Sequence, residues 1–299
     1  MKKKQLTLQQ KTALRGWAAV LPALLLTMLI CGYPAVQTII KSLTSWNGIG
    51  AAKYVGLKNY IKILGEKQFW ELLRNTFVYL LFIPAQLFIG IVVAVLIYEE
   101  IPGWKVFRIV YYIPQVISTM VIGYIFSVMF GLHGPLNTIL MKIGLMQKPI
   151  AWMEDGAMAR TIVIICLVWI NIGWQAMLAL GGLSSIPTSV YEAAELDGAG
   201  YWIRLFRITL PMLGRTIEYS CIVSVMWVFA SLFPLIYSMT GGGPGHETTT
   251  LDYMIYLKSF SSSSKYGYAS ALAVILIIIV VILTIIQFKV SNRQNNWEG

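Results

Sequence analysis

Amide, hydroxyl and indole side chains recur within long stretches of this sequence that contain no charged residue. Asn171, Trp174 and Gln175 are spaced so that they are neighbours on a helix. Amides and hydroxyls can hydrogen-bond to hydroxyl groups, and an indole ring can cover an apolar C–H face. These residue types therefore indicate a site for a neutral, hydroxyl-rich ligand. The candidates are Gln115, Thr119, Asn171, Trp174, Gln175 and Trp227.

The same polar groups also suit a second role, in which they join membrane helices through interhelical hydrogen bonds. Asn171 and Gln175 are costly when they face lipid, so they are expected to face other helices or a cavity. For Gln115, Asn171 and Trp174 both interpretations stay open. The packing role is favoured for three serines in the same stretches, because a serine hydroxyl can bond to its own helix backbone. These serines are Ser118, Ser224 and Ser231.

A second group of residues, from 187 to 211, has the pattern of a short helix in a loop. Ser189 and Glu192 have the spacing of a capping box at the start of a helix. Gly198 and Gly200 can end the helix by adopting positive φ angles. A helix of about ten residues is marginal alone in water. It must therefore dock, either on the helix ends of its own chain or in the groove of a partner, where it would act as a lever.

The composition indicates which elements carry these residues. Of 299 residues, 57% are hydrophobic and only 12% are charged, about half the charged fraction of a soluble domain. The net charge of +10 comes from basic residues in the short gaps between apolar runs, where membrane proteins keep their anchors. A nucleic-acid partner is therefore not expected, whereas lipid is.

Six uncharged segments are long enough to cross a bilayer as helices, so the predicted fold is all-α and polytopic. Prolines inside three of them predict kinks at Pro84, Pro114 and Pro234. The segments are 16–40, 75–98, 109–130, 161–181, 219–240 and 269–288.

Basic residues near the first span favour a cytoplasmic N-terminus at 1–15. An even number of spans then places the C-terminal segment 289–299 in the cytoplasm as well. The predicted location is a cell membrane, and the loop at 182–218 faces the cytoplasm.

The spans contain no ionisable residue from which to build a proton relay. The chain also has no phosphate-binding G-x-x-x-x-G-K-[ST] motif. Its three cysteines lie apart in apolar runs, and its two histidines stand alone in loops, so neither a metal site nor a catalytic residue is expected. If the chain moves solute uphill, another subunit supplies the work.

The loop at 189–211 resembles the EAA loop of permeases of ABC importers. The pattern is EAA, three residues, Gly, nine residues, I-x-LP, and every position matches. Asp197 also fits the carbohydrate-importer version. The matching residues are Glu192, Ala193, Ala194, Asp197, Gly198, Ile208, Leu210 and Pro211.

The resemblance extends over nearly the whole chain and places it with the larger maltose-type and glycerol-3-phosphate-type permeases. It implies a type I importer fold in the bacterial cell membrane, with a first span and outside loop at 16–70 and the permease domain at 71–288. It also implies a second permease, a pair of ATPases that bind ATP and Mg²⁺, and an extracytoplasmic binding protein. The chain itself would hold no cofactor and would not be an enzyme. Residues 192–198 would form the coupling helix.

The implied cargo is a sugar or oligosaccharide. Gln115, Thr119, Asn171 and Trp174 align with the sugar contacts of the maltose-type permease. Glycerol 3-phosphate or another non-sugar solute is an alternative, although no basic residue lies in the spans. An independent, ion-coupled carrier is the third hypothesis.

Overall fold

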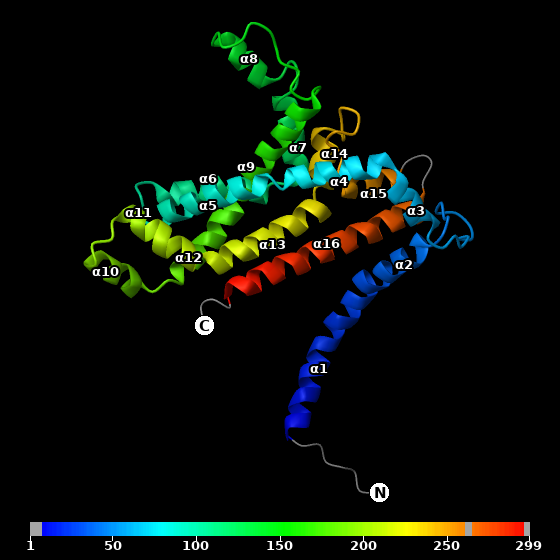
Figure 1. The fold of residues 1–299 in the computed structure, drawn as a ribbon, viewed down its shortest axis with the longest axis horizontal. Helices are drawn as coiled ribbons and strands as arrows, with labels where there is room; N and C mark the ends of the chain where they lie inside the picture. Colours follow the sequence, from blue (N-terminus) through cyan, green and yellow to red (C-terminus); the bar gives the residue numbers. More distant parts are fainter. Residues whose placement is uncertain (1–7, 261–264, 296–299) are drawn as a thin grey trace. The chain divides into compact units, whose positions relative to one another are not determined.

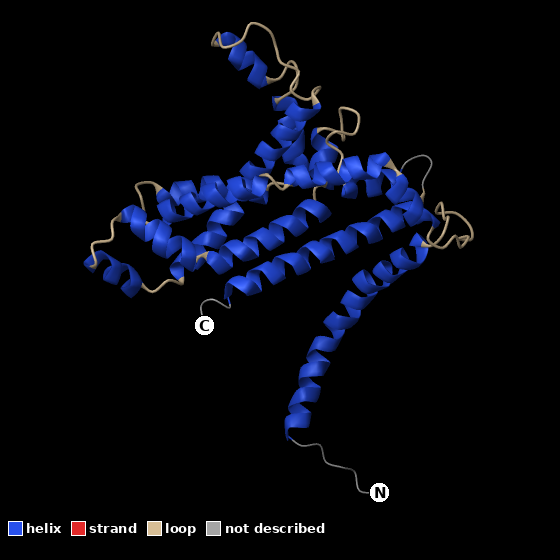
Figure 2. Cartoon of the chain, viewed as in Figure 1, coloured by secondary structure: helices blue, strands red, loops and turns tan. Residues whose placement is uncertain are grey.

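The structure, a computed structural model, describes residues 8–260 and 265–295. It is helical throughout, and a single isolated bridge between Thr44 and Tyr54 is the only β-pairing in these ranges (Figure 2). The predicted all-α class is therefore confirmed.

The chain divides into two compact units. The first comprises 1–63 and 258–275, and the second comprises 64–257 and 276–299. The N-terminal elements are α1 (Leu8–Thr27), the π-helix η1 (Met28–Gly32), α2 (Tyr33–Ser42), α3 (Lys58–Gly65), α4 (Lys67–Tyr79), α5 (Phe82–Tyr98), α6 (Trp104–Val116), α7 (Thr119–Met129) and α8 (Pro135–Lys142) (Figure 1). The C-terminal elements are α9 (Gly156–Ser184), α10 (Thr188–Leu196), α11 (Tyr201–Arg204), the π-helix η2 (Leu205–Thr209), α12 (Leu210–Met212), α13 (Gly214–Ala230), α14 (Phe233–Met239), α15 (Leu251–Phe260) and α16 (Tyr266–Asn295).

In the first unit, α1, η1 and α2 form one apolar helix whose most hydrophobic stretch has no buried residue. The chain after α2 is fastened by polar groups. The Asn59 amide donates to the carbonyls of Ser42 and Thr44 at 2.8 and 2.9 Å. The backbone N–H of Gly267 donates to the Trp46 carbonyl at 2.9 Å. The loop between α2 and α3 is thus ordered by its own chain.

In the second unit, α5, α6 and α9 pack against one another through glycines. A Cβ on Gly90 of α5 would meet the side chain of Gln175 on α9, and a Cβ on Gly173 of α9 would meet the carbonyl of Tyr111 on α6. Because glycine has no side chain, these helix backbones approach closely.

Four helices are long and apolar enough to cross a membrane: 14–42, 67–98, 156–184 and 266–290. The expected six spans are reached only if two bent pairs each count as one span. These pairs are α6 with α7, bent by 98°, and 201–212 with α13, bent by 60°. The chain is a multi-pass membrane protein.

Two expected spans, which contain Pro114 and Pro234, are each divided into two helices. The segment 109–130 breaks after Pro114, where Ile117 is extended (φ −78°, ψ 140°). The segment 219–240 breaks after Ala230, and helix resumes as α14 with Pro234 in its first turn. The interruptions near Pro114 and Pro234 confirm those kinks, since proline cannot donate a helical hydrogen bond. Pro84 lies in the first turn of α5, just after the interruption between α4 and α5.

Candidate functional site

A cavity of about 280 Å³ lies where the break between α6 and α7 meets α9 and α13. The α6–α7 break supplies side chains from two helix ends, since Gln115 lies in the last turn of α6 and Thr119 begins α7. Helices α9 and α13 supply the remaining walls. The lining residues are Gln115, Ile117, Thr119, Ile170, Asn171, Trp174, Tyr219, Val223, Ser224 and Trp227.

The cavity brings together five of the six side chains in which the sequence predicts a ligand site. They come from separate segments of the chain and are Gln115, Thr119, Asn171, Trp174 and Trp227. The sixth, Gln175, does not line the cavity. It is fully buried and accepts a hydrogen bond from the Ser220 hydroxyl on α13. One residue along a helix is a rotation of about 100°, so Gln175 faces neighbouring helices when Trp174 faces the cavity.

The cavity has unused hydrogen-bonding capacity and no charged lining residue. Among the described residues, the side chains of Gln115, Thr119 and Trp174 have no hydrogen-bond partner. The Asn171 amide donates to the Leu167 carbonyl at 2.8 Å, which leaves its oxygen available. Donors, acceptors and two indole rings in an uncharged space suit a neutral ligand that carries hydroxyl groups.

Gln86 is a polar residue beside the cavity that the sequence reasoning missed. It is fully buried on α5, and its amide donates to the Ser224 hydroxyl at 2.7 Å. Ser224 in turn lines the cavity. The available signal was a lone amide in an otherwise apolar span, because such a residue must face a partner.

The break between α13 and α14, near the cavity, is held by Asp252. Its carboxylate accepts from the backbone N–H of Phe233 at 2.6 Å and of Tyr253 at 2.9 Å, and from the Thr250 hydroxyl. Burial raises the pKa of Asp252, and these hydrogen bonds oppose the rise. Asp252 therefore ties the start of α14 to α15.

Helix α10 carries the EAA residues, and its start differs from the prediction. The N-cap position is Pro187, with no capping side chain, and Ser189 lies inside the helix. The predicted capping box is therefore wrong, because the helix begins two residues earlier than Ser189 needs for that role. At the other end, Gly198 has φ +75° as predicted, whereas Gly200 is extended and precedes α11.

One face of α10 docks on its own chain. Val190 and Tyr191 pack against a cluster that includes Leu183 and Leu213. Ala194 is buried, and Glu195 forms an ion pair with Arg204 at 3.6 Å.

The Tyr191 hydroxyl lies 3.2 Å from the Thr209 hydroxyl. The second half of the motif thus lies beneath α10. Its members are Ile208 in η2 and Leu210 and Pro211 in α12.

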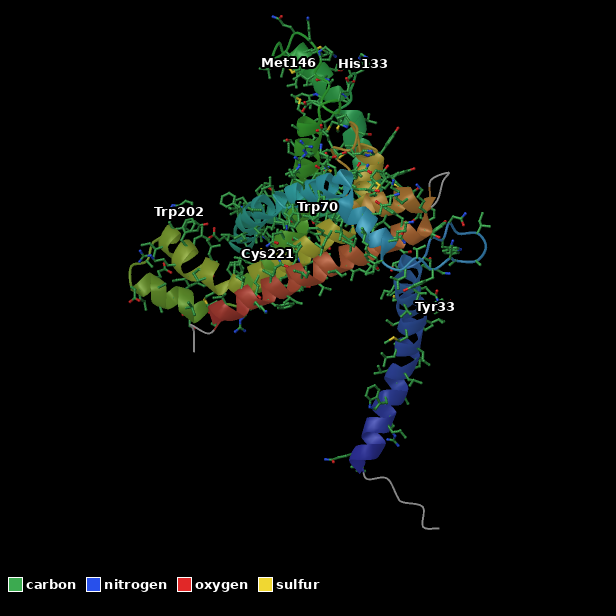
Figure 3. All side chains as sticks on the ribbon, turned by 45° about the vertical axis from the view of Figure 1, so that its right-hand side comes forward. Tyr33, Trp70, His133, Met146, Trp202 and Cys221 are labelled. Atoms are coloured by element: carbon green, nitrogen blue, oxygen red, sulfur yellow. The ribbon has the colours of Figure 1, made fainter. Side chains whose placement is uncertain are left out.

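The opposite face of α10 is open. Glu192, Ala193, Asp197 and Gly198 are exposed, and Leu196 at the end of the helix is 90% exposed. Neither Glu192 nor Asp197 has an ion pair among the described residues. Nearby, Trp202 projects from α11 and is 66% exposed (Figure 3). Leu196 thus forms an apolar tip beside the unpaired carboxylates of Glu192 and Asp197. Such a tip suits insertion into a groove of a partner whose edge carries basic residues.

The matching family model covers residues 86–295 and describes the inner membrane component of binding-protein-dependent transport systems. The chain belongs to this family. It is a transport component of the membrane. A lactose transport system permease protein of Rhizobium radiobacter is 29% identical over 91% of this chain and 92% of its own length. A probable ABC transporter permease protein of Bacillus subtilis is 34% identical over 90% of this chain and 93% of its own length.

The family fold is also seen in a solved structure. A chain in the crystal structure of a bacterial alginate ABC transporter, in complex with an alginate pentasaccharide-bound periplasmic protein, matches with a TM-score of 0.82. It is 21% identical, over 95% of this chain and 96% of that chain. The likeness establishes the type of permease fold that the resemblance implied.

Proposed function

We propose that this chain is a permease subunit of an ATP-driven, binding-protein-dependent importer of a sugar or oligosaccharide. The observation that carries the proposal is the uncharged cavity, in which amides, hydroxyls and two indole rings converge from α6, α7, α9 and α13. A sugar presents many hydroxyls and an apolar ring face, which match these groups. The lactose permease protein among its relatives supports this class of cargo.

The work of transport comes from elsewhere. No titratable side chain other than tyrosine lines the cavity, so an ion-coupled cycle has no group to carry a proton. We infer that two ATPase subunits bind ATP and Mg²⁺, and that one of them receives the exposed face of α10. A second permease completes the passage, an extracytoplasmic protein delivers the sugar, and both termini of this chain lie in the cytoplasm.

Glycerol 3-phosphate is a weaker candidate for the cargo. An anion at this depth requires basic partners, and neither Lys nor Arg lines the cavity.

Uptake by a reconstituted assembly tests the proposal. The assembly is purified from its own cells through a tag on this chain and sealed in vesicles with ATP inside. Labelled lactose, trehalose, maltose and glycerol 3-phosphate are then offered with the binding protein. We expect concentrative uptake of at least one sugar, dependent on ATP, and no uptake by vesicles that contain this chain alone. Uptake by the chain alone without nucleotide, or uptake of glycerol 3-phosphate in preference to every sugar, contradicts the proposal.

A further inference from the structure

Gln86 on α5 meets Ser224 on α13 behind the wall of the cavity. The Gln86 amide nitrogen donates to the Ser224 oxygen at 2.7 Å. Gln86 is fully buried, whereas Ser224, 5% exposed, lines the cavity. Ser224 donates to no acceptor among the described residues. A hydroxyl has one hydrogen, so a serine whose oxygen accepts from an amide keeps that hydrogen for another partner.

We propose that Gln86 is a positioning residue that makes Ser224 a hydrogen-bond donor toward the cavity. The inference rests on the proposed function, in which the cavity receives a sugar. The recognised group is then a sugar hydroxyl oxygen, or the ring oxygen, that accepts the Ser224 hydrogen. Gln86 never touches the sugar and acts only through the direction of the Ser224 hydroxyl.

The polar groups behind Gln86 favour this orientation of its amide. One turn away along α13, Ser220 donates to the oxygen of Gln175. The nitrogen of Gln175 and the oxygen of Gln86 are both buried without a partner. One is a donor and the other an acceptor, so they are complementary.

The two residues belong to helix segments that are in direct contact. A Cβ on Gly90, one turn after Gln86, would come within 2.7 Å of the Gln175 Cβ. A water molecule or a small side-chain movement can therefore join the two amides. Each side chain then donates to the next one in the series. Ser220 donates to Gln175, Gln175 to Gln86, Gln86 to Ser224, and Ser224 into the cavity.

The reversed amide of Gln86 is disfavoured. In the reversed orientation, the two N–H groups of the Gln86 amide would be buried without an acceptor. In the observed orientation, only the Gln86 oxygen is buried without a donor. Each unpaired buried polar group costs free energy. Reversal would also oppose the N–H of Gln175 with another N–H group.

A purely structural role makes a different prediction. If the four side chains only hold α5, α9 and α13 together, their removal lowers stability and affects every sugar equally. If Gln86 orients Ser224, its removal also changes how strongly the transporter distinguishes a sugar from an analogue that lacks one hydroxyl. The contrast between sugars therefore separates the two roles.

The experiment measures uptake in vesicles by the complete assembly. The probes are whichever of lactose, trehalose and maltose is taken up fastest, and its set of monodeoxy and ring-carba analogues. The measured quantity is the ratio of uptake of the parent sugar to that of each analogue. The binding protein is the same for every variant, so its own preference cancels when ratios are compared.

We expect one position at which the parent-to-analogue ratio falls about fivefold in both Ser224→Ala and Gln86→Met relative to the unmodified protein. Gln86→Glu should also lower this ratio, because a carboxylate accepts the hydrogen bond from the Ser224 hydroxyl, which then cannot donate to the sugar. Ser224→Thr keeps a hydroxyl and should keep the ratio. Ser238→Ala is the control, since it removes a hydroxyl that donates to the Pro234 carbonyl within α14 and lies outside both the cavity lining and the four-residue series, and it should keep the ratio.

Three results overturn the inference. The ratios are unchanged in Ser224→Ala and Gln86→Met, or Ser238→Ala loses the same ratio, or the unmodified assembly takes up no sugar. Only the last also rejects the proposed function. Ser224→Ala removes a single oxygen, so it carries the test even if Gln86→Met fails to assemble.

Discussion

The side-chain hydroxyl of Tyr191 in α10 lies 3.2 Å from that of Thr209 in η2. This contact joins the first half of the EAA loop to the second, across the turn that Gly198 makes with φ +75°. A short helix that transmits force must be held at its base, and this hydrogen bond is part of that hold. The contact is therefore a direct way to test whether α10 acts as a lever.

Tyr191→Phe removes the hydroxyl and keeps the ring in the apolar cluster. One such hydrogen bond contributes about 1 kcal/mol, so we expect the sugar imported per ATP hydrolysed to fall about fivefold. Both rates are measured on the same vesicles. Tyr124→Phe is the control, because Tyr124 is 66% exposed on α7. An unchanged ratio in Tyr191→Phe would show that the hydroxyl pair does not support coupling.

Glu192→Lys reverses a charge on the open face of α10. The side chain is exposed and unpaired within the described part of the chain, so membrane insertion and folding should be unaffected. We expect loss of the ATPase subunits from the purified assembly, measured by their yield on a tag carried by this chain. Glu154→Lys, an exposed residue just before α9, should retain them. Normal ATPase recovery and transport in Glu192→Lys would reject the lever role of α10.

Trp174→Ala and Asn171→Ala test the cavity. Each removes a lining group, one an aromatic platform and the other an amide, so we expect uptake to fall about tenfold with assembly unchanged. Assembly is checked by size-exclusion chromatography. Trp17→Ala removes an exposed indole on α1 that does not line this cavity and provides the comparison. Wild-type kinetics in both cavity variants would return these two residues to the packing role.

Two glycines on α9 form a matched pair for stability. A Cβ on Gly173 would meet the Tyr111 carbonyl and lie 3.1 Å from the Cα of Tyr112, whereas a Cβ on Gly181 has nothing within 4 Å. Gly173→Ala should therefore push α6 away and lower the thermal midpoint by several degrees, corresponding to about 1–3 kcal/mol. Gly181→Ala should leave it unchanged or raise it, since alanine favours helix. Equal midpoints for the two variants would contradict the close packing of α6 on α9.

The stability contribution of Asp252 depends on pH. Burial raises its folded-state pKa above the ordinary value, so protonation favours the folded state. This contribution is fully present below the unfolded-state pKa, about 3.9, and is lost as pH rises through the folded-state pKa. We expect the stability of the wild type relative to Asp252→Asn to increase as pH falls from about 7 to about 4. Thermal unfolding of both proteins across this pH range measures their difference in stability. A difference that does not change with pH would contradict the raised pKa.

Periodicity and charge distribution were enough to predict the membrane class, because a span must be apolar over its whole length. The helix interruptions near Pro114 and Pro234 were also predictable, since proline removes a backbone donor. The 98° bend after Pro114 was not predictable. It depends on the extended Ile117 and on the packing of α7 against α14, which no local pattern encodes.

The residues of the cavity could be proposed by type, but their convergence could not. Gln175 and Trp174 are adjacent in sequence, and only the rotation of α9 decides which of them reaches the cavity. Gln86 was missed because its partner, Ser224, is 138 positions away. The capping box failed because Pro187 occupies the N-cap position and α10 begins at Thr188, so Ser189 already lies inside the helix.

The pairing of Gln86 with Ser224 also limits how the length of this chain can vary. One residue inserted within α5 ahead of Gln86 would rotate the amide by about 100° about the helix axis, turning it away from α13. Insertion is thus as disruptive there as losing the amide outright. Between α8 and α9, by contrast, extra residues would lengthen an exposed connection and leave the register of every cavity helix intact.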